Sequence, residues 1–153
     1  MKLEKGITGF IDSRKQQKLL RIDTGLLKKC AYACRPTEFN LDKIVEPSAS
    51  SNYYRLSYQP KRKGQPSLNV VVNRCYPLYV GITTDSEWMQ LQFIDLPKRI
   101  RTCFDEHFTY LPPEWLTTEF TEEALAALSK TEISEIKYWG VKTYGEVIFN
   151  GFD

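Results

Sequence analysis

The chain has 153 residues, of which 42% are hydrophobic and 26% are charged, so it can form the core of a single domain spanning residues 1–153. It contains neither a run of roughly 18 apolar residues that could cross a bilayer nor the apolar segment of a secretory signal, so no membrane partner is expected and a cytoplasmic location is favoured. Four scattered cysteines exclude a disulfide scaffold, and no further soft ligands stand at the spacing of a metal site.

The net charge of +2 hides an uneven distribution along the chain. Residues 1–104 carry 18 Lys and Arg against 9 Asp and Glu, whereas residues 105–153 carry 3 against 10. If the two parts are separate in space, each face should attract a partner of opposite charge. If they interleave, their charges cancel and the pattern has no consequence for binding.

The first predicted element is a helix near residues 25–34, within a basic segment. This helix should end before Pro36, because the residue that precedes a proline resists the α conformation. Cys30 and Cys34 would share one face of the helix, and both are interpreted as reduced, buried thiols. Residues 46–52 then have the composition of a surface loop.

Alternating apolar residues predict strands between residues 53 and 93. The apolar positions are Tyr54, Leu56 and Tyr58, then Leu68, Val70 and Val72, then Leu78, Val80 and Ile82, then Met89, Leu91 and Phe93. A hairpin loop is expected at residues 60–67 between the first two runs. Because parallel strands need long crossover connections, these short connections favour an antiparallel sheet of about four strands.

Helical spacing returns after Asp95. The apolar residues at this spacing are Ile100, Cys103, Phe104, His107 and Phe108. The stripe that they form should cover one face of the sheet. Further along, Thr121 can cap a helix whose first turn holds Glu122 and Glu123, where the helix dipole favours negative charge.

Two capping boxes predict the last helices. The spacing at residues 129–132 predicts a helix that runs to about Trp139. The spacing at residues 143–146 repeats the pattern before a short final helix, after which Gly151 suits the C′ position. The expected fold class is therefore α+β, with an antiparallel sheet packed against helices and a helical C-terminal third.

No arrangement of residues indicates catalysis. The single histidine, His107, lies on the predicted apolar stripe and is interpreted as a core or partly buried residue. A nucleophilic pair with Cys103 is possible at i, i+4 spacing, but no third group that would orient it is evident. Adjacent carboxylates diverge by roughly 100° on a helix, and no glycine-rich phosphate loop is present. We therefore expect neither an enzyme nor a bound cofactor or metal.

A short basic run occupies the predicted hairpin loop. It consists of Lys61, Arg62 and Lys63. Basic side chains near aromatic ones can bind nucleic acid through phosphate contacts and base stacking. A charged hairpin tip that keeps a sheet edge soluble is the favoured interpretation, and the acidic last third would repel a long nucleic acid.

Aromatic and acidic residues occur together in the last third of the chain. The candidate contact residues are Glu114, Trp115, Glu119, Glu122, Glu123, Glu132 and Glu135. Protein interfaces use aromatic anchors within a polar rim, so this set suits a basic protein partner such as a nuclease that binds RNA.

Several segments of the chain carry a resemblance to a known family. The segments are Gly6–Phe10, Ser51–Tyr54, Asn73–Pro77, Glu135–Trp139 and Gly145–Asn150, together with Asp153. They resemble the immunity proteins of contact-dependent inhibition and Maf-type toxin systems. The resemblance implies a small cytoplasmic bacterial protein, with no catalytic residues, that neutralises a cognate secreted toxin domain by binding it at a one-to-one ratio. It implies a basic ribonuclease as the partner, bound by the acidic segment 114–135, or an acidic toxin bound by the basic run. A homodimer is compatible with it.

Two other classes of function remain open from the sequence. One is a small nucleic-acid-binding regulator that uses the basic first two thirds of the chain, whose affinity should fall steeply with salt. The other is a degenerate enzyme or a ligand carrier with a pocket between the sheet and the helices.

Overall fold

The computed structural model describes residues 2–10, 20–33, 39–48, 51–83 and 90–151. Its strands are β1 (Phe39–Val45), β2 (Tyr53–Pro60), β3 (Leu68–Asn73), β4 (Leu78–Ile82), β5 (Phe93–Ile94) and β6 (Thr109–Tyr110). Its helices are α1 (Thr24–Tyr32), α2 (Lys98–Phe104), α3 (Pro113–Leu116), the 3-10 helix η2 (Glu122–Leu125), α4 (Lys130–Trp139) and α5 (Tyr144–Ile148). The fold is α+β, as the sequence predicts.

The strands form one sheet in the order β1-β2-β3-β4-β5, with each neighbouring pair antiparallel. The short strand β6 pairs with β4 in the parallel direction, after a connection that contains α2. The described part of the chain thus has a sheet of six strands, whereas the sequence predicted about four. The additional strands are β1 and β6, while β5 is much shorter than the predicted run at residues 89–93.

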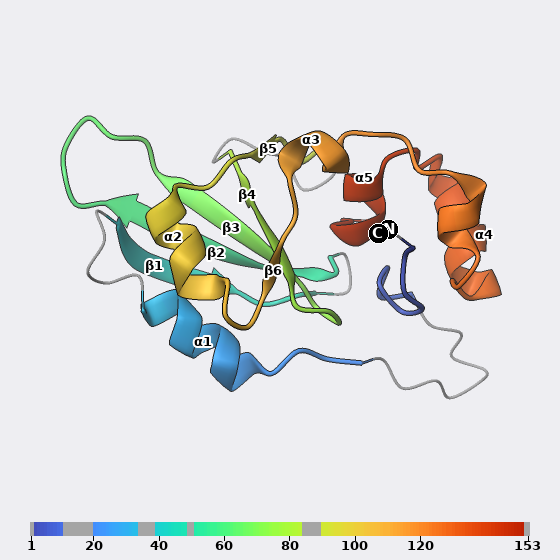
Figure 1. Cartoon of the computed structure of the whole chain (residues 1–153), viewed down its shortest axis with the longest axis horizontal. Helices are drawn as coiled ribbons and strands as arrows, with labels where there is room; N and C mark the ends of the chain where they lie inside the picture. The colour runs from blue at the N-terminus through green and yellow to red at the C-terminus, as the bar shows by residue number, and fades with distance from the viewer. Residues whose placement is uncertain (1, 11–19, 34–38, 49–50, 84–89, 152–153) are drawn as a thin grey trace.

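One face of the sheet packs against α1 and α2. The predicted alternation on β2 and β3 is confirmed by the register, which places Tyr54 opposite Val72 and Leu56 opposite Val70. Buried side chains of both helices, such as Leu27 and Ile100, join the same hydrophobic cluster. Figure 1 shows the two helices side by side on this face. The predicted apolar stripe of α2 therefore covers the sheet as expected.

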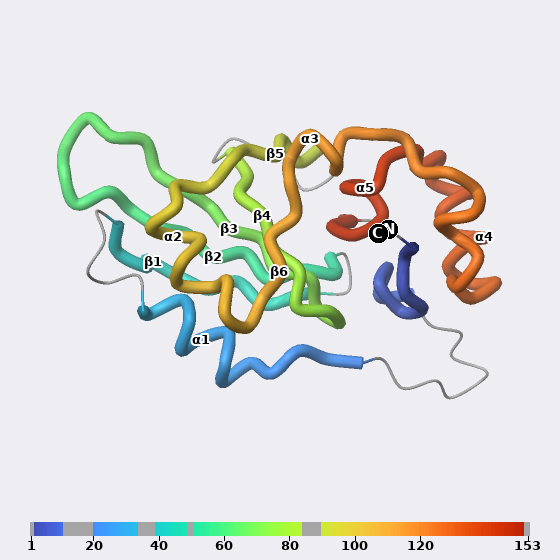
Figure 2. The backbone as a smooth tube through the Cα atoms, viewed as in Figure 1, coloured from blue at the N-terminus to red at the C-terminus, as the bar shows by residue number. Residues whose placement is uncertain are grey.

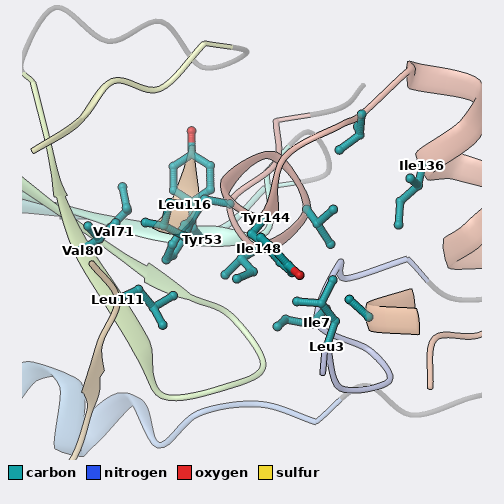
Figure 3. Packing of buried hydrophobic residues seen from close by; sticks show 14 of the residues in the cluster. Leu3, Ile7, Tyr53, Val71, Val80, Leu111, Leu116, Ile136, Tyr144 and Ile148 are labelled. Carbon is teal, nitrogen blue, oxygen red and sulfur yellow. The ribbon is translucent and has the colours of Figure 1, made fainter. Parts of the chain in front are cut away.

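The opposite face packs against both ends of the described chain. Val71 and Val80 of the sheet share a core with Leu3 and Ile7 from the N-terminal turn (residues 3–10) and with side chains of the last helices. Figure 3 shows Leu3 and Ile7 next to Ile148 of α5, with Ile136 of α4 beyond them. This second core positions the C-terminal helices and their surface carboxylates.

The helix ends follow their predicted capping residues. The capping box at residues 129–132 is formed at the start of α4, and Gly140 ends this helix with a φ of 66°, a conformation that suits glycine. Thr143 caps α5, but α5 ends at Ile148, so Gly151 does not occupy the predicted C′ position. Thr121 caps only the single 3-10 turn η2.

Several predictions fall outside the described residues or need correction. Cys34 and Met89 lie outside the described ranges. The helix predicted near residues 25–34 is described as α1, which starts one residue earlier than expected and is described to Tyr32. Helix α2 ends at Phe104, so His107 does not continue its apolar stripe and lies exposed, contrary to its interpretation as a core or partly buried residue. Among the described helices, none combines the length and the apolar character needed to cross a membrane.

Candidate protein-binding site

The helices α3, η2, α4 and α5, here termed the acidic end, rest on packed aromatic rings. Trp115 of α3 stacks on Tyr144 of α5, with ring centroids 4.3 Å apart and an interplanar angle of 21°. Phe120 meets the same Tyr144 ring edge-on at 6.4 Å. Such ring pairs stabilise by more than the area they bury, so they fix α3 against α5.

Four of the predicted contact carboxylates lie exposed at the acidic end. They are Glu114, Glu119, Glu122 and Glu123. Glu114 stands in the first turn of α3, and Glu122 and Glu123 in the first turn of η2, where the unpaired backbone N–H groups favour negative charge. The half-buried Trp115 follows Glu114 directly. The acidic end thus combines exposed carboxylates with the half-buried Trp115, and interfaces are enriched in aromatic residues within a polar rim.

Glu135 is half-buried, and its carboxylate is hydrogen-bonded to a neighbouring indole ring. Its Oε2 accepts a hydrogen bond from Nε1 of Trp139 at 3.1 Å. The adjacent Tyr138 is 79% exposed and lies edge-on to Trp139, with centroids 5.3 Å apart. Tyr138 is therefore an exposed aromatic residue of the acidic end that the candidate set omits.

Glu132 does not lie on this surface, contrary to its predicted role as a contact residue. It is 1% exposed. Its Oε1 accepts from the backbone N–H of Gly6 at 2.9 Å and of Ser129 at 3.2 Å. Its Oε2 accepts from the hydroxyl of Thr8 at 2.6 Å and from the backbone N–H of the same residue at 3.3 Å. A buried carboxylate needs such donors, so Glu132 anchors the N-terminal turn to α4.

A second buried polar group, the asparagine cluster (Asn52, Asn73 and Asn150), lies next to this turn. Asn52 and Asn73 both donate through Nδ2 to the backbone carbonyls of Ile7 and Ile148, at 2.7 to 3.0 Å. The backbone N–H of Asn150 donates to Oδ1 of Asn52 at 2.8 Å. Figure 2 shows the N-terminal segment in dark blue against α5 in red. The cluster thus links the N-terminal turn, the sheet and the C-terminal segment.

Four segments that are far apart in the sequence meet at this cluster. Gly6–Phe10, Ser51–Tyr54, Asn73–Pro77 and Gly145–Asn150 each supply one of its hydrogen-bonding groups. Another segment, Glu135–Trp139, belongs to α4, which carries Glu132. Because the hydrogen-bonding groups of the cluster are buried and bonded to one another, they hold the fold together and do not form a contact surface.

The basic run lies at the opposite end of the molecule. Lys61, Arg62 and Lys63 are exposed in the loop between β2 and β3, which confirms the predicted hairpin loop. In Figure 1 this loop and α4 stand at the two ends of the long axis. The basic hairpin loop and the carboxylates of the acidic end therefore lie far apart, although Lys130 and Lys137 are also exposed on α4.

A cavity of about 350 Å³ opens beside the aromatic base of the acidic end, between β5, α3 and α5. The sequence did not reveal it, because its walls come from three separate segments. Its lining includes apolar Leu91, Phe93, Leu116 and Phe149 and polar Thr117, Thr143 and Glu146. Pockets of this size bind small ligands or single side chains of a partner.

The thiols and the histidine do not form the pair that the sequence allowed. Cys103 Sγ donates to the backbone carbonyl of Arg99 at 3.3 Å, and His107 Nε2 lies 3.8 Å from a carboxylate oxygen of Glu106. Burial raises the pKa of the Cys30 and Cys75 thiols, which keeps both protonated at neutral pH. Protonated buried thiols are poor nucleophiles, as predicted for structural cysteines.

Comparison with known proteins gave no relative. No family model matches the sequence, and no significant match was found among curated proteins or among solved structures. Within the ranges that the structure describes, no group of three or more His, Cys, Asp or Glu side chains is placed to hold a metal ion. Function is therefore inferred from the geometry and charge of the chain, together with the resemblance noted in its sequence.

Proposed function

We propose that this protein is an immunity protein that binds and neutralises a cognate toxin domain, with the acidic end as its contact surface. The observation that carries this proposal is the exposure of Glu114, Glu119, Glu122 and Glu123 in the part of the fold that also holds the stacked Trp115 and Tyr144 rings. An interface of this kind gains its association rate from charge and its residence time from a desolvated aromatic or Arg centre. The resemblance of the fold-holding segments to immunity proteins supports the same class.

A basic ribonuclease domain is the partner that this surface suits best. Ribonucleases bind polyanionic RNA through basic clefts, and a rigid surface with several exposed carboxylates is complementary to such a cleft. Binding there would cover the substrate site and stop cleavage, and it would require no catalytic residue in the inhibitor. The producing cell would hold the inhibitor in its cytoplasm, where the toxin acts.

The test is a pull-down of the tagged protein from its native lysate, washed with about 0.5 M salt, followed by mass spectrometry. We expect one polypeptide at a near one-to-one ratio whose isolated domain arrests growth when expressed alone. Co-expression of the protein should relieve that arrest, while a Glu122→Gln/Glu123→Gln variant should relieve it less. A captured polypeptide that is harmless to cells, or an arrest that the protein does not relieve, would contradict the proposal.

A nucleic-acid-binding regulator is the second candidate, and the separation of charge favours it. The exposed run Lys61–Lys63 lies far from the acidic end, so the carboxylates would not repel a nucleic acid bound at the hairpin loop. Recovery of RNA alone in the same pull-down, lost in a Lys61→Ala/Arg62→Ala/Lys63→Ala variant and at higher salt, would establish this candidate in place of the first.

A further inference from the structure

The cavity between β5, α3 and α5 has an apolar aromatic floor. The rings of Phe93 and Phe149 lie 6.0 Å apart at 48°, and Leu116 beside them is fully buried. A Cβ added to Gly145 would stand 2.4 Å from the Phe93 ring and 2.9 Å from the backbone oxygen of Leu116. Because α5 packs this closely on β5 and α3, the floor is a fixed surface that a partner does not have to form on binding.

The rim of the same cavity is negatively charged. Glu146 is the one charged side chain among the described residues that line it, and this carboxylate is exposed. Its Oε1 accepts from the Thr143 hydroxyl at 2.9 Å, which fixes its position above the floor. A carboxylate accepts several hydrogen bonds, so Glu146 can bind a further donor. Glu119 is joined to Thr143 by a β-bridge and adds negative charge nearby.

We propose that this cavity seats an arginine side chain of the toxin domain as the anchor of the interface, an inference that rests on the proposed function and deepens it. Arginine matches both parts of the cavity, since its guanidinium plane can stack on the half-buried Phe93 ring while its N–H groups pair with the Glu146 carboxylate. Phe149 is itself buried and packs against Phe93. Lysine pairs with the carboxylate but lacks the planar group, and an apolar side chain makes no use of Glu146. Arginine is also among the residues most enriched at interface hot spots.

The first test uses N-acetyl-arginine methylamide as the probe and needs no toxin. Titration followed by two-dimensional amide NMR should shift the signals of Gly145, Asn150 and Gly151, with a dissociation constant on the order of 1 to 10 mM for so small a ligand. Glu146→Gln should weaken binding about fivefold or more, because the charge is lost while the amide oxygen still accepts from Thr143. Glu46→Gln, which removes an exposed carboxylate near the end of β1, is the matched control and should change nothing.

The control probes decide whether the cavity selects the cation. The norleucine and lysine counterparts should bind more weakly than the arginine probe. Equal binding of the norleucine probe, an absence of shifts at these residues, or an affinity that Glu146→Gln leaves unchanged would overturn the proposal.

The second test separates this inference from the proposed function. If the pull-down recovers a toxin that Glu146→Gln and a cavity-filling Thr117→Trp variant bind as tightly as the original chain, the anchor is wrong while the function stands. If no toxin is recovered but the arginine probe binds as described, the cavity does bind arginine and the proposed function is contradicted.

Discussion

At the scale of single residues, Asn73 uses all of its hydrogen-bonding capacity to join three parts of the chain. It is 0% exposed, and its Nδ2 donates to the carbonyls of Ile7 and Ile148. Its Oδ1 accepts from the backbone N–H groups of Cys75 and Tyr76, at 2.9 and 3.0 Å. An asparagine can make four such bonds, and each buried group left unpaired costs free energy.

We therefore predict that Asn73→Ala lowers the free energy of unfolding by about 3 to 4 kcal/mol, because the buried N–H of Cys75 and the partly buried N–H of Tyr76 lose their acceptor and two carbonyls lose a donor. Urea unfolding followed by circular dichroism measures this change. Asn40→Ala, at an exposed position on β1, is the control and should change stability by less than about 0.5 kcal/mol. A similar small loss for both variants would show that the asparagine cluster does not hold the fold.

Tyr79 provides a prediction for alkaline pH. It is fully buried, and its hydroxyl donates to Oδ1 of Asp105. Burial first and the carboxylate second raise its pKa above the ordinary tyrosine value of about 10, because both disfavour the phenolate. The unfolded chain therefore releases this proton at a lower pH than the folded chain does. The resulting stability is complete below about pH 10 and falls as pH rises further.

Tyr79→Phe should cost about 1 kcal/mol at neutral pH and should reduce the loss of stability between about pH 9 and about pH 11. Part of the alkaline loss should persist, because burial raises the pKa of Tyr53 and Tyr54 as well. Urea titrations across this range make the measurement. Tyr138→Phe, on the exposed surface, is the matched control. If the free energy of unfolding falls equally steeply with alkaline pH in the two variants, the assignment to Tyr79 is contradicted.

At the scale of elements, Glu132 couples the N-terminal turn to α4. Its carboxylate both completes the capping box and accepts from Gly6 and Thr8, more than 120 residues away in the chain. We predict that Glu132→Ala releases the turn, because those donors lose their acceptor. Hydrogen exchange at the amides of Gly6 and Thr8 should accelerate about tenfold or more, while the amides of β3 remain the slowest to exchange.

Glu135→Ala on the same helix is the control for this measurement. It removes a carboxylate that accepts only from the Trp139 ring among the bonds described for it, so the exchange of Gly6 and Thr8 should stay as it was. Equal acceleration in both variants would mean that loss of helix α4, and not loss of the Glu132 bonds, exposes the turn.

The elements also show why part of the fold was predictable from sequence. Alternation on β2 and β3, the capping box at residues 129–132 and the cap at Thr143 are local patterns, and the structure contains them where expected. The second predicted capping box is only half formed, because the Glu146 side chain accepts from the Thr143 hydroxyl and not from its backbone N–H. Strand β1 was missed because its register shifts between Leu41 and Lys43, so the apolar residues Phe39, Leu41 and Ile44 do not keep a period of two. Strand β6 has two residues and depends on its parallel pairing with β4, which no local pattern indicates.

The candidate site was predictable to a similar degree. Exposed carboxylates such as Glu122 follow from a polar turn after a capping residue, whereas the burial of Glu132 depends on donors from the far end of the chain. The capping box predicted one of its contacts and gave no sign of the others. The cavity needs β5, α3 and α5 together, so it appears only in the folded molecule.

At the scale of the whole molecule, the separated charges predict how a basic partner approaches. Exposed carboxylates at one end and the basic hairpin loop at the other give the protein a dipolar charge distribution, which orients the acidic end toward positive potential during diffusion. For the toxin domain recovered in the pull-down, Glu122→Gln/Glu123→Gln should lower the association rate about threefold to tenfold at low salt. This difference should shrink as ionic strength passes about 0.15 M, where charges more than about 8 Å apart are largely screened.

Stopped-flow mixing measures the association rates of the original chain and of the variant. The matched control is Lys61→Ala/Lys63→Ala, because it removes the same number of charges from the opposite end. That control should leave association unchanged or faster; slower association would mean that the partner is acidic and binds at the hairpin loop.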